Sequence, residues 1–598
     1  MSFKHPYTAA FLGGDRQPMS GAAMTSEGLP AETGIISVDA VGMRTLNLAE
    51  KIVMTSGVED MLARWRTEDG ADPSKGGRPS IISDTTVLIL MSIIAIESRP
   101  MHLQQAVDII TRRASNDVLR RLGLPERDKD DYTSAAGLHA WYMRLHRAWN
   151  RVRSVVDSYP EVSYHERMTK DEFDAVVKMR DVAAIQSKMK RLAAFDNALI
   201  MASVAMMPAE HQGAWAGDVC VDGTPIPAAK KGTTRLGQLA SSEPDAGWYV
   251  RDGEHRGDEQ RDGASKLMWA YEATLATQTF AADDKGTPSL IVGMSMDKPG
   301  HRIAENAVQS LDHLIADPSA PKGHFMGDRA YLPGAKAEKL ALPLRGAGYK
   351  MMGDLSVASR GLNATYEGAE LIDGTWYFPG MPADWKTASV DYYNGTITME
   401  ELTEIVDKRQ AFALIPKFID YDGSVTYKSP LRDKWAKLRF DGIEPHPNAK
   451  SRKLTKIFRK NLPKRIEDTA VWQRKQLRIP ADAGAKYAQQ GPAWGTQEWA
   501  DIYRRGRSTI ESRNRLLKNN RLALGDHTRR LVRGFANAAL VVALGIVAVN
   551  IHLIDSFIKA LSTGTPRAAR VGRQAQCERF TSIETTRDMA GNAPPVVA

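Results

Sequence analysis

The spacing of hydrophobic and polar residues changes along the chain, and its N-terminal third follows a helical period. Between residues 36 and 210, apolar residues recur at helical spacing, which predicts helices over 84–97, 103–122, 139–158 and 182–207. Asp84 stands where a helix cap is expected, and Arg99-Pro100 separates the first two helices. We therefore expect an all-helical N-terminal region in which residues 84–122 could form a helix-turn-helix.

From residue 216 the pattern changes to short apolar runs between turns, which is typical of a sheet. Asp222 and Asp328 each fall at the end of a predicted strand, where rigid backbone can hold a carboxylate in a fixed position. By analogy of element order alone, this mixed α/β pattern suggests the RNase H-like fold. The predicted strands are 217–222, 267–280, 289–296, 323–328 and 349–354, and the predicted helices are 302–316 and 335–342.

A long segment with hairpin-like runs, at 370–378 and 410–419, follows the predicted sheet, and we interpret it as a strand-rich insertion into the core. Both chain ends lack periodicity and are expected to be flexible. The predicted organisation is a flexible N-terminus, a helical region, a first part of the core, an insertion, a last part of the core and a flexible tail, at residues 1–35, 36–210, 211–354, 355–492, 493–561 and 562–598.

Two apolar stretches, 86–96 and 538–549, are shorter than the roughly 18 to 20 residues that cross a bilayer, so we interpret them as buried core helices. The N-terminus lacks the charged start and apolar run of a signal peptide. The two cysteines, Cys220 and Cys577, exclude a disulfide-rich fold and zinc sites that need paired cysteines. These features predict a cytoplasmic protein with no membrane partner.

The net charge of +9, from 80 Lys and Arg against 71 Asp and Glu, is compatible with a polyanionic partner. Residues 450–465 contain eight Lys or Arg and no acid, and Arg459 and Lys460 among them are candidate contacts to DNA phosphates. A solvated surface is the alternative there. The loop Lys75-Gly-Gly-Arg-Pro-Ser80 is either a DNA contact or a plain linker. DNA contact is also predicted for the basic residues of the second helix, Arg112, Arg113, Arg120 and Arg121.

Three acids can be assigned to metal chemistry. Cleavage and joining of phosphodiesters can use two divalent ions held by carboxylates, the hard oxygen donors that suit Mg²⁺. Asp222 and Asp328 supply two of them, and Glu511 lies in a polar, strongly periodic segment that predicts a helix over 496–520. Arg507 precedes Glu511 by four residues and Lys518 follows it by seven, so all three fall on one face of a regular helix.

These blocks resemble those of the bacterial insertion-sequence DDE transposases, whose third block reads Tyr-x2-Arg-x3-Glu-x6-Lys. The segment from Arg507 to Lys518 matches it fully, whereas Tyr503 stands one residue further from Arg507 than in the pattern. Val221-Asp222-Gly-Thr224 resembles the family's Asp-x-Thr block, and Gly327-Asp328-Arg-Ala-Tyr331 its Asp-Arg-x-Tyr block. The resemblance covers roughly residues 217–549.

The resemblance implies that Asp222, Asp328 and Glu511 are the catalytic residues and bind two Mg²⁺ ions, for which Mn²⁺ can substitute. Double-stranded DNA, as transposon terminal inverted repeats and as target, would be the partner, and a homodimer is expected in the synaptic complex. The residues implied in DNA contact, besides the basic segment above, are Arg507, Lys518, Tyr503 and Arg329.

The predicted function is therefore a DNA transposase that cleaves transposon ends and transfers the strands into target DNA. Two alternatives remain: a catalytically inactive DNA-binding protein derived from a transposase, and an RNase H-like nuclease without strand transfer. Trp376 and Tyr377 in the insertion could stack on a flipped base or form the core of a hairpin. His301 could approach the site, or cap a helix at the surface.

Overall fold

The computed structural model describes residues 40–71, 80–127, 134–162, 167–230, 232–234, 236–251, 266–280, 287–429, 469–520, 523–527, 532–563 and 579–580. Three predicted features lie outside these residues: the loop at 75–79, the basic segment at 450–465 with Arg459 and Lys460, and the N-terminal segment 1–35. Most of the tail, 562–598, also lies outside them. Contacts group Val41–Ala598 into one compact unit, which contains every element described below.

The N-terminal region is helical, as predicted, but the segment 103–122 is not one helix. It divides into α4 (Leu103–Asp108), a π-helical turn (Ile109–Arg113) and α5 (Asn116–Arg121). A new cap causes the break, because the Ser115 side chain accepts a hydrogen bond from the Val118 amide and starts α5. The other helices here are α1 (Met43–Ser56), α2 (Val58–Glu68), α3 (Asp84–Ile96), α7 (Ala135–Val156), α8 (Lys170–Lys178), α9 (Val182–Val204) and α10 (Ala209–Gln212).

The cap of α3 is Ser83 and not Asp84, because the Ser83 side chain accepts a hydrogen bond from the Thr86 amide. Asp84 instead lies in the first turn and pairs with Arg66 at 2.5 Å and with Arg151 at 3.1 Å. α3 itself is buried on nearly every side, in contact with α1, α7 and α20 (Phe535–Ser562). The arrangement of α3 is therefore that of a core helix.

The arginines predicted to contact DNA from the second helix are all engaged by acids of the same region. Arg113 is buried and pairs with Glu97 at 2.6 Å. Arg112, Arg120 and Arg121 are more exposed, and their respective partners are Asp108, Asp117 together with Glu126, and Glu50. These pairs neutralise part of the positive charge that DNA contact would use, and DNA contact by these arginines stays a prediction.

One mixed sheet forms the centre of the protein, with β4 and β2 end to end along one edge of β3, and β1, β5 and β6 following in order on the other side. β3 is antiparallel to β1, β2 and β4, whereas β1, β5 and β6 are mutually parallel. The sequence prediction missed β2. The strands are β1 (Val219–Pro227), β2 (Gly247–Arg251), β3 (Lys266–Gln278), β4 (Ile291–Asp297), β5 (His324–Met326) and β6 (Lys350–Met352).

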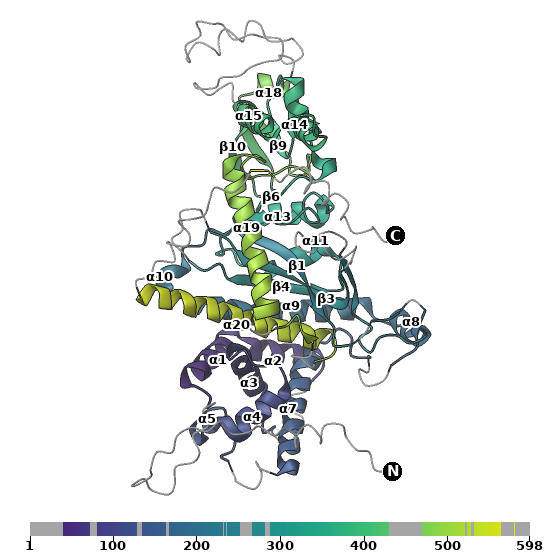
Figure 1. Cartoon of the computed structure of the whole chain (residues 1–598), viewed down its shortest axis with the longest axis vertical. Coiled ribbons are helices and arrows are strands. Elements are labelled where there is room, and N and C mark those ends of the chain that lie inside the picture. The colour runs from purple at the N-terminus through teal and green to yellow at the C-terminus, as the bar shows by residue number, and fades with distance from the viewer. Residues whose placement is uncertain are drawn as a thin grey trace. The chain divides into compact units, whose positions relative to one another are not determined.

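Helices cover both faces of this sheet (Figure 1). The face with Cys220 and Ile226 belongs to the largest core cluster, together with α9, α20 (Phe535–Ser562) and the N-terminal helices. The face with Val219 and Val221 packs against the short helices that follow β4 and β5. These are α11 (Ile303–Gln309), α12 (Asp312–Ala316), a 3-10 turn (Ala337–Lys339) and α13 (Ala341–Gly346), so each predicted helix of the sheet region is divided in two.

Two buried asparagines cover the outer edge of β4. Asn197 of α9 donates to the Met294 carbonyl at 3.0 Å and accepts from the Met294 amide at 2.8 Å. Asn550 of α20 makes the same pair of bonds with Ile291, at 2.8 and 2.9 Å. An uncovered strand edge can pair with another chain, and these amides replace the missing strand. The bonds thereby fix α9 and α20 against the sheet.

The apolar run predicted as a buried core helix is the middle of α20. Its length and apolar composition would let it cross a membrane, but 89% of its most apolar window is buried inside the protein. It contacts α3 and α9, which bury it on several sides. This is the environment of the core helix of a soluble protein.

The insertion has its own hydrophobic core, separate from that of the sheet. Trp376 and Tyr377 are buried in it, so of the two interpretations above the structure favours the hairpin core. Two antiparallel sheets, β7-β8-β9 and β10-β11-β12, pack with helices that the sequence analysis did not predict. The elements are β7 (Leu362–Tyr366), β8 (Ala369–Ile372), β9 (Thr375–Tyr377), α14 (Ala383–Tyr393), α15 (Met399–Arg409), β10 (Ile415–Ile419), β11 (Val425–Lys428), α18 (Ala470–Gln473) and β12 (Gln476–Ile479).

Asp196 in α9 is a buried carboxyl group that should make the stability of the protein depend on pH. Its side chain is 1% exposed, one carboxyl oxygen has no hydrogen-bond partner among the described residues, and burial raises its pKa well above the ordinary value. The folded protein therefore holds a proton here that the unfolded chain releases above about pH 4. The stabilisation is complete below that pH and is lost as the pH rises.

We expect the free energy of unfolding of the wild type to fall between pH 4 and 7 more steeply than that of Asp196→Asn, in which the side chain stays neutral. Urea unfolding across this range measures both slopes. Parallel slopes would mean that Asp196 is ionised in the folded state.

Candidate active site

Asp222 and Asp328 lie on adjacent strands at the same level of the sheet. Cys220 of β1 is paired with Met326 of the parallel strand β5, so the two aspartates stand two residues beyond a matched pair. Asp328 follows the end of β5, as predicted. Asp222 does not end its strand, because β1 continues to Pro227 through its pairing with β3. The long strand β3, and not a turn after Asp222, holds this carboxylate in place.

The predicted polar helix is α19 (Gln497–Arg515), which runs past the sheet (Figure 1) and is capped by Thr496. Gly506 allows it to approach β1 and β5 closely. A Cβ atom at this position would lie 2.9 Å from the Met326 sulfur and 3.5 Å from the Cys220 Cβ. The absence of a side chain therefore lets the next residue, Arg507, reach the end of the sheet where Asp222 lies.

The guanidinium of Arg507 lies between two of the predicted catalytic acids. Its Nη1 is 3.4 Å from Oδ1 of Asp222, and its Nη2 is 3.7 Å from Oε1 of Glu511. The other Asp222 oxygen accepts a hydrogen bond of 3.0 Å from the side chain of Asn514, one turn further along α19. The Glu511 side chain is 66% exposed, so it can change rotamer without disturbing the core.

The charges at this end of the sheet influence one another. Burial raises the pKa of Asp222 to about 6, Asp328 and Glu511 add to the rise, and Arg507 opposes it. The pKa of Arg507 lies well above its ordinary value because of Asp222, although burial acts in the opposite direction. Titratable groups perturbed by burial and by specific charged neighbours are typical of functional sites.

A further carboxylate, Glu272 of β3, interacts electrostatically with Asp222 and Asp328 and was missed in the sequence analysis. Burial raises its pKa to about 6, and Asp222 and Asp328 contribute, while a 2.8 Å hydrogen bond from the Gly300 amide opposes the rise. A Cβ atom at position 223 would lie 2.6 Å from the Glu272 Oε1 atom. The glycine of the Asp222-Gly-Thr224 block thus leaves room for this carboxylate. The signal available in the sequence was one acid inside an otherwise apolar strand.

Three residues implied in DNA contact have other positions in the structure. Tyr503 is 6% exposed, stacks on Trp499 and donates a 2.9 Å hydrogen bond to the Gly327 carbonyl, so it positions the chain before Asp328 and has no free surface for DNA. Arg329 donates to the Asp354 carboxylate at 2.7 Å. Lys518 lies in a π-helical turn (Leu516–Asn520), which shifts it from the direction that a regular α-helix predicts.

His301 also has a local partner, since its Nδ1 atom lies 3.1 Å from an Asp297 oxygen. Its side chain is 58% exposed, and of the two interpretations above its position at the surface is the one observed.

Within the described residues, no three Asp, Glu, His or Cys side chains are grouped closely enough to hold a metal ion. The donor chemistry nevertheless suits Mg²⁺, because Asp222, Asp328 and Glu511 offer carboxylate oxygens. Burial is the main cause of the raised pKa of Asp222, and repulsion from Asp328 and Glu511 adds to it; a divalent cation relieves such repulsion. The exposed Glu511 side chain would have to turn toward the two aspartates.

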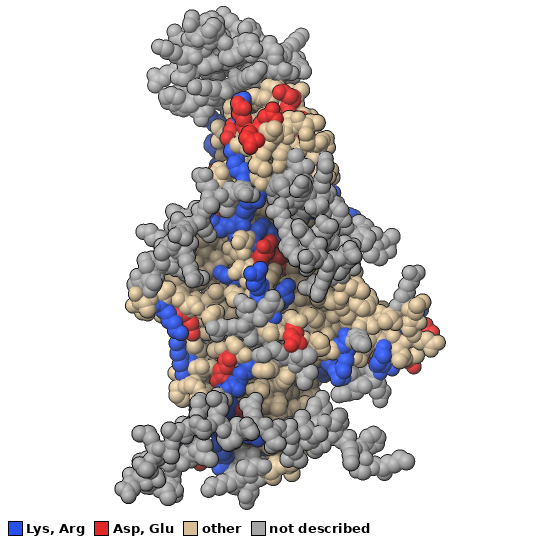
Figure 2. Space-filling model, viewed as in Figure 1, with Lys and Arg blue, Asp and Glu red and all other residues tan. Residues whose placement is uncertain are grey.

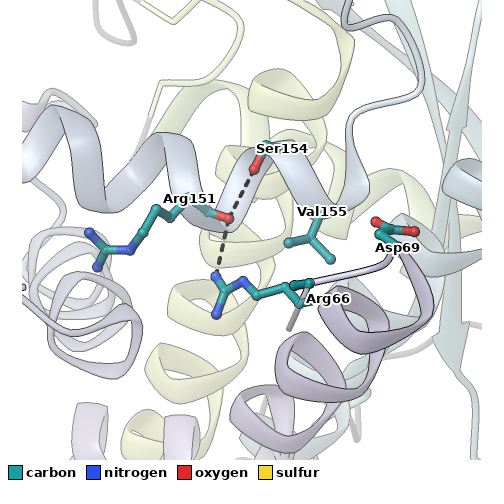
Figure 3. A pocket seen from close by; sticks show the side chains of 6 residues that line it. Arg66, Asp69, Arg151, Ser154 and Val155 are labelled. Carbon is teal, nitrogen blue, oxygen red and sulfur yellow. Dashed lines mark hydrogen bonds between the residues drawn. The ribbon is translucent and has the colours of Figure 1, made fainter. Parts of the chain in front are cut away.

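A separate pocket lies between α2 and α7 (Figure 3) and includes Arg66, Asp69 and Arg151. Its charged groups are already paired: Arg66 with Asp84, and Asp69 with Lys188 and Arg191 at 2.7 Å each. None of the clustered acids lines it, and we assign it no function.

Gly223→Ala tests the role of Glu272. We expect a 10- to 100-fold loss of metal-dependent activity, roughly as for other residues that orient metal ligands, because the new methyl group displaces the Glu272 carboxylate. If the effect acts through Glu272, Gly223→Ala combined with Glu272→Ala should lose no more activity than Glu272→Ala alone. Additive losses would assign Gly223 a role independent of this carboxylate. Activity assays and circular dichroism of the three variants measure this.

No family model matches the chain, and neither a curated protein nor a solved structure matches it.

Proposed function

We propose that the protein is a metal-dependent DNA transposase with an RNase H-like core. The observation that carries the proposal is the meeting of Asp222, Asp328 and the Arg507–Glu511 face of α19 at one end of the sheet. These groups come from three distant parts of the sequence. They are also the residues of the three blocks that resemble the DDE transposases.

The topology of the sheet supports the fold assignment. The order β4-β3-β1-β5-β6, with β3 antiparallel to its neighbours and the last three strands parallel, is the arrangement found in RNase H-like domains. This remains an analogy of fold, which alone does not assign a function. The carboxylates of Asp222 in β1 and of Asp328 after β5 add a chemical argument to this analogy, because they can bind metal ions.

In this proposal Asp222, Asp328 and Glu511 bind two Mg²⁺ ions, or Mn²⁺ in their place. Bound there, the ions would supply an activated oxygen nucleophile and neutralise charge at the scissile phosphate. Arg507 would hold the phosphate and balance the negative charge of Asp222 and Glu511 before DNA binds. Asn514 and Tyr503 position Asp222 and the chain before Asp328 through the hydrogen bonds described above.

The charge distribution supports a double-stranded DNA partner. In Figure 2, Lys and Arg side chains gather on the visible face along the line of α19. Of the five arginines of this helix, Arg504, Arg505, Arg507 and Arg515 are at least partly exposed, whereas Arg513 is buried. Such a stripe suits a phosphate backbone. In this proposal the DNA partners are the transposon terminal repeats and the target DNA. The protein acts as a homodimer in the synaptic complex, and it is located in the cytoplasm.

The test is incubation of the purified protein with DNA that contains the ends of its own element, with Mg²⁺ or with a chelator. We expect cleavage at the ends and joined products with Mg²⁺ alone. Cleavage without joined products would favour the nuclease alternative. Specific binding of the ends without cleavage would favour the inactive DNA-binding alternative. The absence of both binding and cleavage would contradict the proposal.

A further inference from the structure

A second group of charged residues lies where the sheet, the insertion and the C-terminal segment meet. A narrow pocket there is lined by four arginines, one acid and three aromatic side chains. Arg329 and Asp354 follow strands β5 and β6, and Arg504 comes from α19. The lining residues are Arg329, Asp354, Arg360, Tyr392, Trp494, Arg504, Arg579 and Phe580.

Two of the four arginines have acidic partners. Arg329 pairs with Asp354 at 2.7 Å, and Arg579 pairs with Asp407 at 2.6 Å. The carboxylate of Asp354 also accepts hydrogen bonds from the Trp494 indole at 2.9 Å and from the Leu355 amide at 2.8 Å, and it forms no ion pair with Arg360 or Arg504.

The other two arginines have no carboxylate partner among the described residues. Arg360 is 8% exposed, donates to the Ser389 carbonyl at 3.1 Å and lies over the rings of Tyr393 and Trp494. Arg504 forms no ion pair with any described residue. The pocket therefore contains about two positive charges that the structure does not balance.

Three of these guanidinium groups also have an unused donor. The Nε atoms of Arg329, Arg360 and Arg504 are buried and have no hydrogen-bond partner among the described residues. Unpaired buried donors and unbalanced buried charges are costly unless a ligand satisfies them. Arginine suits tetrahedral oxyanions because its planar fork donates two parallel hydrogen bonds. The enclosed space is about the size of one water molecule, so a phosphate group would have to widen the pocket as it binds.

We infer that this arginine pocket, formed by Arg329, Arg360, Arg504 and Arg579, binds a phosphate group. The group is either a DNA backbone phosphate beside the candidate active site or a free phosphate ion. The inference goes beyond the proposed function, since it adds a phosphate site of which only Arg329 belongs to the motif blocks, while Arg360, Arg504 and Arg579 belong neither to the matched motif positions nor to the acid cluster. It does not require the protein to cleave DNA.

The first test is thermal unfolding in sodium phosphate and in sodium chloride at equal ionic strength. We expect phosphate to raise the unfolding midpoint of the wild type saturably. Arg504→Gln and Arg360→Gln should each weaken phosphate binding about tenfold or more, as expected for a lost charged hydrogen bond. The matched control is Arg474→Gln, which removes a charge from an exposed ion pair with Glu367 and should bind phosphate as the wild type does.

Chemical modification of the wild type provides a measurement that needs no variant to fold. Phosphate should protect Arg504 and Arg360 from phenylglyoxal but leave Arg474 reactive. If a short DNA duplex also protects them and phosphate ions compete with it, the ligand is a backbone phosphate. If only the free ion protects them, the ligand is a free phosphate.

Two results would overturn the inference: equal effects of phosphate and chloride on wild-type unfolding, or phosphate binding by Arg504→Gln that matches the wild type. A failure of the transposase proposal is a separate result. In that case the protein would show no Mg²⁺-dependent cleavage, and phosphate would still protect Arg504 and Arg360 from phenylglyoxal.

Discussion

Asp222→Asn is expected to reduce Mg²⁺-dependent cleavage and strand transfer by on the order of 10³-fold or more, because a metal ligand is worth several kcal/mol of transition-state stabilisation. The substitution preserves the shape of the side chain but removes the negative charge that faces Arg507 at 3.4 Å. Asp328→Asn and Glu511→Gln should have effects of the same order. Gel assays of end cleavage at fixed Mg²⁺ concentration measure the three losses.

Glu305→Gln is the matched control, since Glu305 belongs to α11, pairs with Lys339 at 2.7 Å and takes no part in the acid cluster. It should cleave as the wild type does. Asp222→Cys separates a metal ligand from a purely structural acid, because a thiolate prefers a softer ion than Mg²⁺. Recovery of activity with Mn²⁺ but not with Mg²⁺ is expected. Triad variants that cut as well as the wild type would show that the acids are not catalytic.

Arg409→Met is expected to destabilise the insertion by about 3–5 kcal/mol, the usual cost of leaving one partner of a buried ion pair alone. Arg409 and Asp373 are 1% and 2% exposed, and their charged atoms are 2.5 Å apart. Arg409 also donates to the Trp385 carbonyl, while Asp373 accepts from the Gly361 amide and the Ser389 hydroxyl. The pair therefore links the β8–β9 turn with α14 and α15.

Hydrogen exchange resolved by peptide measures this effect, because the insertion has a core separate from that of the sheet and can open on its own. Faster exchange is expected at β8, β9 and α14, with α20 unchanged. Combining Arg409→Met with Asp373→Asn should recover part of the loss, since it removes the unpaired charge. Asparagine suits position 373, where φ is +48°. Equal exchange in wild type and Arg409→Met would mean that the pair contributes little.

The local sequence predicted a large part of the fold. Short apolar runs between turns identified five of the six strands of the central sheet, and a helical period identified α3, α7, α9 and α19. The spacing of Arg507 and Glu511 was informative for the same reason, since residues four apart meet on one face of a helix, whereas the π-helical turn shifts Lys518 from the predicted direction. Such signals depend only on neighbours along the chain.

Boundaries and partners were less predictable. β2 was missed because it gains its place only through pairing with β3, and Asp222 was placed at a strand end that the same strand extends. The acidic partners of Arg113 and Arg121, which are Glu97 and Glu50, come from distant segments and were not predicted. Glu272 gave only a weak signal, because its importance depends on Asp222, fifty positions earlier in the chain.

By itself, the sequence determined the types of most elements, the polar helix α19 and the three acids of the proposed active site. Only the tertiary structure decided which groups meet: Arg507 between Asp222 and Glu511, Glu272 above Gly223, and Asn550 on Ile291, 259 positions away. The physical reason is the distance over which each kind of interaction acts. Backbone periodicity acts over a few residues, whereas hydrogen bonding and charge act through space between segments that packing of the cores brings together.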